Sequence, residues 1–343
     1  MRAAFCPEPG KIEVRAVPTP EPAAGEVVVR VRACGICGSD LHFYSGQFPP
    51  PPVCPGHEIA GEVARVGAGV TRVREGDAVV VEPLVTCQQC SFCRSGHYQL
   101  CRQLRVLGNM VDGGFADFVR VPEYAIFPLP VRLDWAVAAL AEPLAVAVHG
   151  LRIAPVQAGD CVAVLGAGTI GLLTVAAATA SGASEVWVTA RHPQQAEAAM
   201  KLGATRVFTG TNAYADLAVA ADERAPDVVV ETVGGHADTL EQALPLVRRG
   251  GCVVVLGIFS SMPRLNGILL VIKEVRVVGS MTYGRTIAGA DFERALDLLA
   301  KNGPVLGQIV THRFELEDIA TAFATAADKG SGSIKVSVVA ATG

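Results

Sequence analysis

Thiol, imidazole and carboxylate side chains occur close together in the first part of the chain. Cys37 lies in the stretch Cys34-Gly-Ile-Cys-Gly-Ser-Asp-Leu-His42, and His57-Glu58 follows soon after it. A catalytic zinc ion needs about three protein ligands of these types and one position open to water or substrate. Cys37 and His57 are therefore candidate zinc ligands, with Glu58 or Glu142 as the carboxylate. The alternative is that Cys37 is a buried small hydrophobic residue, the commoner fate of a free cysteine.

Three neighbours of Cys37 carry groups that could serve such a site. Asp40 could accept the second ring N–H of His57 and so orient the imidazole. Ser39 and His42 could pass a proton from a zinc-bound hydroxyl to solvent. Each has a structural alternative, because Ser39 could cap a helix that begins near Asp40 and a lone histidine is more often a surface or core residue. The cysteine and histidines without comparable context are expected to be structural, namely Cys34, His97, His149, His192, His236 and His312.

A second cluster consists of four cysteines in one short segment, Cys87, Cys90, Cys93 and Cys101. Zinc binds four thiolates tetrahedrally, and a short irregular loop with this spacing can wrap round the ion. We therefore predict a structural zinc site, which has no open position and does no chemistry. The alternatives are disulfides or a site that has lost its metal. A zinc ribbon that grips nucleic acid is disfavoured, because the loop has few cationic residues and no basic, aromatic-rich stripe accompanies them.

A glycine-rich loop follows an apolar strand in the second half of the chain. Cys161–Leu165 is the expected strand, and Gly166-Ala-Gly-Thr-Ile-Gly171 opens an alanine-rich helix. In this context the first glycine makes the tight turn, the second lets the backbone approach a pyrophosphate, and the third allows close helix–strand packing. The helix N-terminus then offers N–H groups to the phosphates. The predicted cofactor-binding residues of the loop are Gly166, Gly168, Thr169, Ile170 and Gly171.

The end of the next expected strand bears on which dinucleotide is bound. An acidic residue at this place would bind the ribose 2′-hydroxyl of NAD, but the sequence has Thr189-Ala190-Arg191-His192. No carboxylate is present to repel a 2′-phosphate, and Arg191 could pair with one bidentately. NADP is therefore favoured over NAD. The alternative is that Arg191 is a solvated surface charge and the selectivity is weak.

Two different patterns of expected strands and helices divide the chain into two parts. Short valine-rich strands with glycine and proline turns, such as Glu26–Arg32 and those within Ala60–Val81, indicate a barrel-like β domain. From about residue 151, apolar strands alternate with helices, which implies βαβ units and a parallel sheet. A helix at Asp291–Ala300 and a strand at Ile334–Val339 are expected near the end. The further strands expected in the parallel sheet are Glu185–Thr189, Asp227–Glu231 and Cys252–Leu256.

Length and composition fit an enzyme with more than one domain. The chain has 343 residues, half of them hydrophobic, and a formal net charge of −4, so two domains are expected and no global field attracts nucleic acid. We see no apolar run of the roughly 18 residues that a membrane span needs, and no charged leader with an apolar core at the start. Ten cysteines in C-x-x-C spacings, without such a signal, indicate metal thiolates in a reducing compartment, and we expect the cytoplasm.

Taken together, these motifs resemble the zinc-dependent medium-chain alcohol dehydrogenase superfamily, most closely its sorbitol (polyol), butanediol and threonine dehydrogenase branch. The resemblance covers essentially the whole chain. It implies an α/β fold with a GroES-like β-barrel catalytic domain at 1–150, a Rossmann doubly wound parallel-sheet domain at 151–284, and a C-terminal segment at 285–343 that returns to the catalytic domain. The active site is expected between the two domains. The motifs that carry the resemblance are Gly35-Ile-Cys-Gly-Ser-Asp-Leu-His42, Pro55-Gly-His-Glu58, the four cysteines, Glu142-Pro-Leu144 and Val164–Gly171.

The resemblance also implies roles for single residues. Glu58 is a zinc ligand in the polyol branch, whereas Glu142 matches a position that ligates zinc directly or through water. Ser39 and His42 match the proton relay of alcohol dehydrogenases, and Lys335 matches a basic residue that reaches the cofactor pyrophosphate. The catalytic-zinc ligands Cys37 and His57, and Asp40 as the partner of the ligand histidine, match as well.

Two departures from the family pattern affect the cofactor and the substrate. The aspartate that binds NAD in typical sorbitol dehydrogenases is Ala190 here, followed by Arg191, a pairing similar to that of NADP-using members. The Arg-Tyr pair that holds a sugar alcohol in sorbitol dehydrogenases is replaced by Thr282-Tyr283. Sorbitol itself is therefore in doubt as the substrate.

We expect a zinc-dependent enzyme, with two zinc ions per chain, that oxidises a secondary alcohol to a ketone with NADP⁺. The substrate class is a polyol, a vicinal diol or a sugar-like alcohol, and the family suggests a homodimer or homotetramer. Tyr44 and Tyr283 are candidate substrate contacts, with packed aromatics as the alternative. Two other functions stay open: a threonine or amino-alcohol dehydrogenase, and a non-catalytic, crystallin-like NADP-binding protein.

Overall fold

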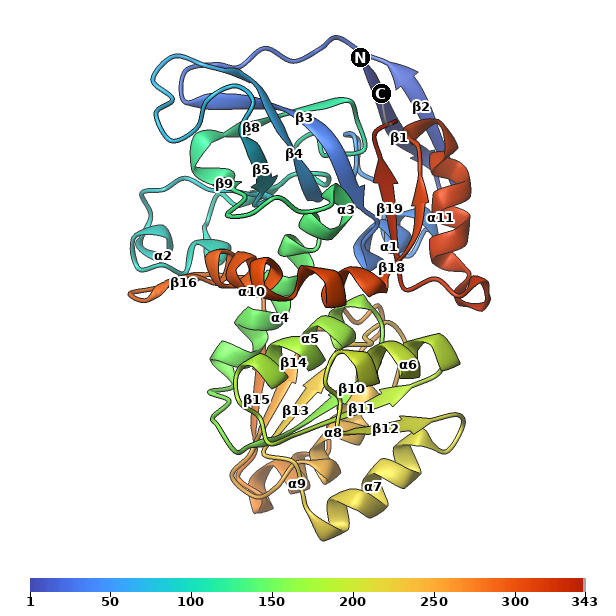
Figure 1. The fold of residues 1–343 in the computed structure, drawn as a ribbon. Helices are drawn as coiled ribbons and strands as arrows, with labels where there is room; N and C mark the ends of the chain where they lie inside the picture. Colours follow the sequence, from blue (N-terminus) through green and yellow to red (C-terminus); the bar gives the residue numbers. More distant parts are fainter. Residues whose placement is uncertain (342–343) are drawn as a thin grey trace. The chain divides into compact units, whose positions relative to one another are not determined.

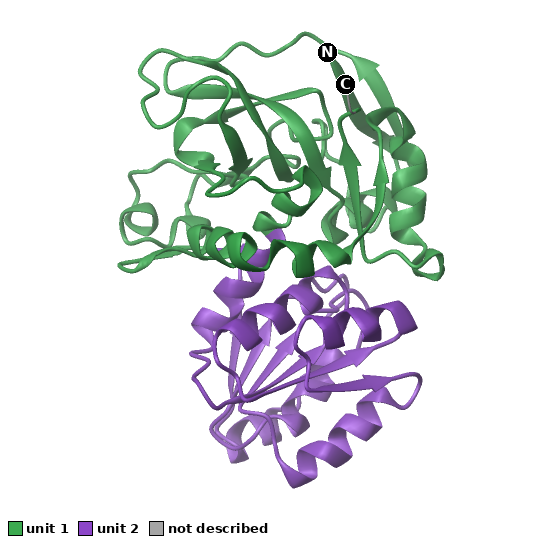
Figure 2. Cartoon of the chain, in the orientation of Figure 1, with its two compact units in different colours: residues 1–142, 284–343 green, residues 143–283 purple. Residues whose placement is uncertain are grey.

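In a computed structural model, which describes residues 1–341, the chain forms two compact units (Figures 1 and 2). The first unit contains residues 1–142 and the segment from Gly284 onward, and the second contains Pro143–Tyr283. The first unit therefore ends earlier than the expected boundary at 150, which lies inside helix α4 (Ala141–Ile153). The C-terminal segment packs with the first unit.

The second unit is built on a six-stranded parallel sheet. Its strand order is β12-β11-β10-β13-β14-β15, and every neighbouring pair is parallel. In chain order this is 3-2-1-4-5-6, the order of a doubly wound dinucleotide-binding sheet. Strands β12 and β15 are additional to those that the sequence indicated. The strands are β10 (Cys161–Leu165), β11 (Glu185–Ala190), β12 (Arg206–Thr209), β13 (Val228–Glu231), β14 (Cys252–Val255) and β15 (Arg276–Gly279).

Helices cover both faces of this sheet. Figure 1 shows α5 and α6 above the sheet, and α7, α8 and α9 below it. Strands β10 and β13 are buried along their whole length, because a parallel sheet covered on both faces leaves no solvated side. The helices are α5 (Thr169–Ala180), α6 (Pro193–Lys201), α7 (Ala213–Glu223), α8 (Thr239–Leu246) and α9 (Gly267–Ile272).

The first unit contains a mainly antiparallel sheet. Its order is β18-β19-β3-β4-β5-β9, with β8 also paired to β3, and β18 and β19 are parallel. The C-terminal strand β19 pairs with β3 near the start of the chain, so residues distant in sequence share this sheet. The strands are β3 (Glu26–Gly35), β4 (Glu58–Val66), β5 (Ala78–Val81), β8 (Phe118–Pro122), β9 (Ile126–Pro128), β18 (Val310–Phe314) and β19 (Lys335–Val339).

Hairpins and helices complete the first unit. Helix α11 lies beside β19 and β2 (Figure 1), and α10 is longer than the expected Asp291–Ala300. The remaining strands are β1 (Arg2–Glu8), β2 (Lys11–Ala16), β6 (Leu84–Val85), β7 (Arg105–Val106), β16 (Arg285–Thr286) and β17 (Gly289–Ala290). The helices are α1 (Gly38–Tyr44), α2 (Ser91–Arg94), α3 (Trp135–Ala138), α10 (Asp291–Leu306) and α11 (Ile319–Ala327).

One helical stretch has the length and composition of a membrane span, which the sequence alone did not lead us to expect. Trp135–Ile153 has 19 residues and a mean hydropathy of 1.5. In the structure 78% of its apolar window is buried inside the protein. Core helices of this kind pass the same length and composition test, and burial here indicates a core role.

Candidate functional site

Backbone pairing brings Cys37 beside His57 and Glu58. Cys37 is the N-cap of α1, directly after β3, and His57 and Glu58 stand at the start of β4. Because β3 and β4 are antiparallel with Gly35 opposite Glu58, the end of one strand meets the beginning of the other. One ligand atom from each of Cys37, His57 and Glu58 lies within 4.8 Å of the others.

Asp40 links the helix start to the imidazole of His57. Its Oδ2 accepts a hydrogen bond from the Cys37 backbone N–H at 2.9 Å, and its Oδ1 lies 3.9 Å from His57 Nδ1. Asp40 is buried, and Oδ1 has no hydrogen-bond partner among the described residues. Burial raises the pKa of this carboxyl, and the charge of His57 partly offsets the effect. Since Cys37 is the N-cap, the alternative that Ser39 caps this helix is wrong.

Lys335 forms a buried ion pair with Glu58. Its ammonium group donates to both carboxylate oxygens of Glu58 at 2.7 Å and to the carbonyl oxygen of Ile36 at 2.9 Å. The side chains of Lys335 and Glu58 are only 3% and 1% exposed. Burial lowers the pKa of Lys335, but the charges of Glu58, Cys37 and Glu142 and the hydrogen bonds to Glu58 together raise it above its ordinary value, so the ammonium stays charged. In this structure Lys335 neutralises a candidate ligand, and its contact with the cofactor pyrophosphate stays a prediction.

Glu142 adds a further buried carboxylate near the site. It lies in the first turn of α4 and is buried, but it is outside the group of atoms that lie within 4.8 Å of one another. Burial lowers the pKa of His57, yet the charges of Asp40, Cys37 and Glu142 together raise it well above its ordinary value.

A divalent cation fits this donor set. Asp40, Glu58 and Glu142 together carry more acidic groups than the ammonium of Lys335, which pairs with Glu58, can neutralise. A metal ion would balance the excess negative charge. The mixed sulfur, nitrogen and oxygen donors are those of catalytic zinc sites.

The other residues predicted near the site differ in burial and in packing. Ser39 and His42 are half-buried on α1. Tyr44 packs its ring on Phe323 with centroids 5.4 Å apart, and Tyr283 is fully buried. Both tyrosines are thus packed aromatics, and their contact with a substrate stays a prediction.

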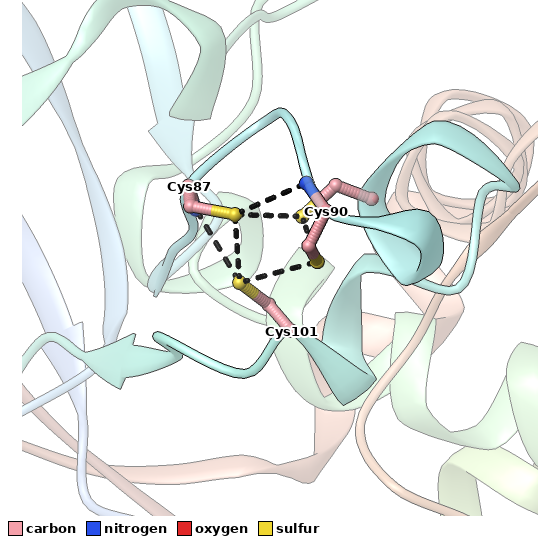
Figure 3. A group of neighbouring side chains, drawn as sticks. Cys87, Cys90 and Cys101 are labelled. Carbon is pink, nitrogen blue, oxygen red and sulfur yellow. Dashed lines mark hydrogen bonds between the residues drawn. The ribbon is translucent and has the colours of Figure 1, made fainter.

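The sulfur atoms of the four cysteines face one another, as Figure 3 shows for Cys87, Cys90 and Cys101. The Cys90–Cys93 and Cys87–Cys101 sulfur distances are 3.5 Å, and the Cys87–Cys93 and Cys90–Cys101 distances are 3.9 and 4.0 Å. Four sulfurs about 2.3 Å from a central zinc would lie roughly 3.8 Å apart, whereas a disulfide needs about 2.05 Å. The cluster therefore has the spacing of a tetrahedral metal site.

Backbone amides hold these sulfurs in place. The N–H of Cys90 points to the sulfur of Cys87 at 3.4 Å, and the N–H of Gln103 points to the sulfur of Cys101 at 3.3 Å. All ten cysteines are free thiols, so the disulfide alternative is wrong. Helix α2 and the turn at Tyr98–Leu100 carry the loop between the cysteines.

The glycine-rich loop has the shape that a pyrophosphate needs. Gly166 has φ +100°, a conformation that favours glycine. A Cβ on Gly171 would lie 1.8 Å from the Gly166 carbonyl oxygen, whereas a Cβ on Gly168 would meet nothing within 4 Å. Gly168 is also the N-cap of α5, whose first residues are Thr169 and Ile170. Open space therefore lies at the helix N-terminus, where phosphates bind.

Ala190 and Arg191 differ in exposure at the end of β11. Ala190 is the last residue of the strand and is buried, while Arg191 is exposed and makes no ion pair with any described residue. Its backbone N–H donates to Gln195 Oε1 at 3.3 Å. The guanidinium group is thus available to an anionic ligand.

Comparison with known proteins identifies the family. The family models described as "Alcohol dehydrogenase GroES-like domain" and "Zinc-binding dehydrogenase" match residues 23–131 and 169–301. Sorbitol dehydrogenase of Bacillus subtilis is 35% identical over 98% of this chain and 97% of its own length. The chain belongs to the zinc-dependent medium-chain alcohol dehydrogenase superfamily.

Two solved structures of this superfamily resemble the whole chain. A candidate zinc-binding dehydrogenase from Sinorhizobium meliloti 1021, bound to NADP, is 34% identical with a TM-score of 0.88, and the match covers 98% of each chain. The 2R,3R-butanediol dehydrogenase from Bacillus subtilis is 32% identical with a TM-score of 0.87, and the match covers 99% of each chain. The expected resemblance and the fold class, GroES-like plus Rossmann, are confirmed, and the protein is an oxidoreductase of the alcohol and polyol dehydrogenase family.

Sequence reasoning on this dehydrogenase missed two buried acids. Glu231, at the end of β13, accepts from the backbone N–H groups of Val233 and Gly234 at 2.7 and 2.9 Å and so shapes the loop beside Gly166. Glu82, just after β5, accepts from the hydroxyl of Tyr98 at 3.0 Å. In both cases the sequence shows an acidic residue at the end of an apolar strand, and this pattern could have indicated them.

Proposed function

We propose that this dehydrogenase oxidises a secondary alcohol of the polyol, vicinal diol or sugar-like class to a ketone with NADP⁺. The observation that carries the proposal is the convergence of Cys37, His57 and Glu58 within 4.8 Å in a buried, acid-rich setting. Such a donor set suits a catalytic zinc ion.

Cys37 and His57 would hold the zinc ion, with Glu58 or Glu142 as the carboxylate. When bound, zinc supplies Lewis-acid polarisation of the substrate hydroxyl. The bidentate contact of Lys335 with Glu58 at 2.7 Å competes with ligation by Glu58, which supports Glu142 as an alternative ligand. Asp40 would orient His57 through the attraction between its carboxylate and the imidazole, whose Nδ1 lies 3.9 Å from Oδ1.

Ser39 and His42 would carry the proton of the alcohol to solvent. Both lie on α1, which begins at the residue after Cys37, so one short helix positions the metal ligand and the relay together. NADP⁺ supplies the hydride acceptor, and the residues of the Gly166–Gly171 loop would bind its pyrophosphate.

The four-cysteine lobe would hold a second zinc ion with a structural role. Four sulfurs fill a tetrahedral coordination shell, so no position is left for substrate. Elemental analysis of the purified enzyme should give about two zinc ions per chain. A content of one would contradict this part of the proposal.

The cofactor is proposed to be NADP because Ala190 offers no carboxylate and Arg191 is exposed beside it. The relative from Sinorhizobium meliloti, which is bound to NADP, supports the same assignment. Arg191 would pair with the 2′-phosphate. Arg191→Ala should then lower kcat/KM for NADP⁺ about 10- to 100-fold while changing that for NAD⁺ little.

We also propose a homo-oligomer, dimer or tetramer, in the cytoplasm. Helix α9 and the loop before it expose several large apolar side chains, including Met262 at 95% and Ile268 and Val271 at 73%, which supports a protein contact there. Ten free thiols support a reducing compartment. Light scattering of the purified enzyme tests the oligomeric state.

The decisive experiment is a panel of polyols, vicinal diols, sugar-like alcohols, amino alcohols and L-threonine, run with both cofactors. Turnover of secondary polyols or diols with a preference for NADP⁺ would support the proposal. Turnover confined to L-threonine or amino alcohols would replace the substrate class. Cofactor binding without turnover of any alcohol would support the non-catalytic alternative instead.

A further inference from the structure

The chain folds back on itself directly after helix α1. The N–H of Gln47 donates to the carbonyl oxygen of His42 at 3.0 Å, and the N–H of Gly46 donates to that of Phe43 at 3.1 Å. Gly46 has φ +77°. These two bonds with a left-handed residue between helix and loop form a Schellman motif, which sets residue 47 over residue 42.

This motif places polar and aromatic side chains against the ring of His42. An apolar contact usually accompanies the motif at these two positions, but here the amide oxygen of Gln47 contacts Nδ1 of His42. The ring of Phe48 meets the His42 ring edge-on, with centroids 5.6 Å apart and planes at 73°. The imidazole is therefore held by two consecutive residues of the fold-back.

The contact with Gln47 assigns the proton to one ring nitrogen. With the amide oxygen of Gln47 facing Nδ1 of His42, Nδ1 is assigned as the N–H donor, because an amide oxygen only accepts hydrogen bonds. In a neutral imidazole the other nitrogen, Nε2, then keeps its lone pair. A relay histidine has to accept its proton at one defined atom in a fixed orientation.

We propose that Gln47 and Phe48 are positioning residues that hold His42 as the Nδ1–H tautomer, with Nε2 ready to accept a proton. This inference rests on the proposed function, in which His42 belongs to the proton relay. Oxidation of the alcohol releases one hydride, which NADP⁺ takes, and one proton. Nε2 takes that proton, the resulting imidazolium keeps its Nδ1–H bond to Gln47, and the proton then passes from Nε2 to water.

The test measures the His42 tautomer and the kinetics of the same holoenzyme. Nitrogen-15 NMR of histidine-labelled protein reports the tautomer at a pH where the ring is neutral, with the His42→Asn variant used to assign its signals. Gln47→Leu removes the acceptor at an exposed position, and Gln47→Glu retains an oxygen acceptor. Ser45→Ala is the matched control, because Ser45 Oγ donates to the backbone carbonyl oxygen of His42, at 3.2 Å, and makes no contact with the imidazole among residues 1–341.

Wild type, Gln47→Glu and Ser45→Ala should show the Nδ1–H tautomer, and Gln47→Leu should lose it. Gln47→Leu should also lower kcat about tenfold with KM for the alcohol within about twofold, and Gln47→Glu should recover most of that loss. Phe48→Leu should give a smaller loss of kcat, because only the edge contact is removed.

The failures of the two proposals can be told apart. If His42→Asn leaves turnover unchanged, the relay in the proposed function is wrong. If His42→Asn lowers turnover but the wild-type ring is the Nε2–H tautomer, or Gln47→Leu keeps the Nδ1–H tautomer, the positioning role of Gln47 is wrong and the relay stands.

Discussion

The four-cysteine lobe takes its donors from a single loop, whereas the Cys37 site takes its donors from separate parts of the first unit. Cys87 to Cys101 are close in sequence, and their sulfurs alone make the cluster. Cys37 follows β3, His57 and Glu58 begin β4, and Lys335 begins β19. The first cluster is a local structure, and the second exists only once the sheet has formed.

The two clusters also differ in burial and in charge. Three of the four lobe cysteines are partly exposed, and backbone N–H groups surround their sulfurs. At the other site Glu58, Asp40 and Lys335 are almost fully buried, so any unbalanced charge there is costly. A closed sulfur cluster suits stability, and a buried cluster with mixed donors suits chemistry.

Removing one ligand of the open site should have the largest effect. Cys37→Ser should lower turnover at least about 10³-fold, because Lewis-acid stabilisation of several kcal/mol is lost, and should leave one zinc ion per chain. Steady-state assays, metal analysis and a cofactor-binding titration check this, and NADP binding should persist. Cys54→Ser is the control, because a serine keeps the hydrogen bond to the Phe115 carbonyl oxygen. Full activity in Cys37→Ser would falsify the catalytic-zinc assignment.

Removing one sulfur of the lobe should affect stability first. Cys90→Ser should release the structural zinc ion and lower Tm by about 10 °C, since a loss of roughly 3–4 kcal/mol is expected for an opened metal site. Metal analysis with differential scanning calorimetry checks this. The catalytic zinc ion should remain, and simultaneous loss of both ions would show that the two clusters are not independent.

Breaking the ion pair between Lys335 and Glu58 should have the next largest effect, on the free energy of unfolding. Lys335→Met leaves the buried Glu58 carboxylate without its partner, which should lower the free energy of unfolding by about 3 kcal/mol. Lys301→Met, at an exposed position, should change it by less than about 0.5 kcal/mol. Denaturant titration measures both. The double variant Glu58→Gln/Lys335→Met should recover part of the loss, and a purely additive result would argue against the pair.

Removing the carboxyl group of Glu82, which contacts Tyr98 of the lobe, should change the free energy of unfolding least. The size of this change should depend on pH. Burial raises the pKa of Glu82 from 4.5 to about 8, although the bond from Tyr98 opposes this. The folded protein therefore holds a proton that the unfolded chain has lost, so the free energy of unfolding falls as pH rises from about 5 towards 8.

Glu82→Gln removes that titration. The stability of the variant relative to wild type should increase by about 2 kcal/mol between pH 5 and pH 7, measured by denaturant unfolding at each pH. A constant difference across this range would show that Glu82 does not titrate there.

Local patterns in the sequence predicted the parts of the fold and of the site that depend on neighbouring residues. Cys161–Leu165 is a strand as expected, and the Gly166–Gly171 loop opens a helix, because apolar runs and glycine turns act over a few residues. Strands β12 and β15 were missed, since Arg206–Thr209 and Arg276–Gly279 begin with an arginine and are short. The helix expected at Asp291–Ala300 continues to Leu306, because Pro304 near its end did not stop it.

The sequence by itself determined the four-cysteine cluster, the glycine-rich loop and the pairing of Cys37 with His57 as candidates, because residue type and spacing carry that information. Only the tertiary structure placed Lys335 on Glu58, 277 residues away, since strand pairing from β19 through β3 to β4 makes that contact. It likewise joined Tyr98 of the lobe to Glu82. The register of the paired strands and the burial of the side chains decide which charges are compensated. Neither register nor burial can be read from a local sequence pattern.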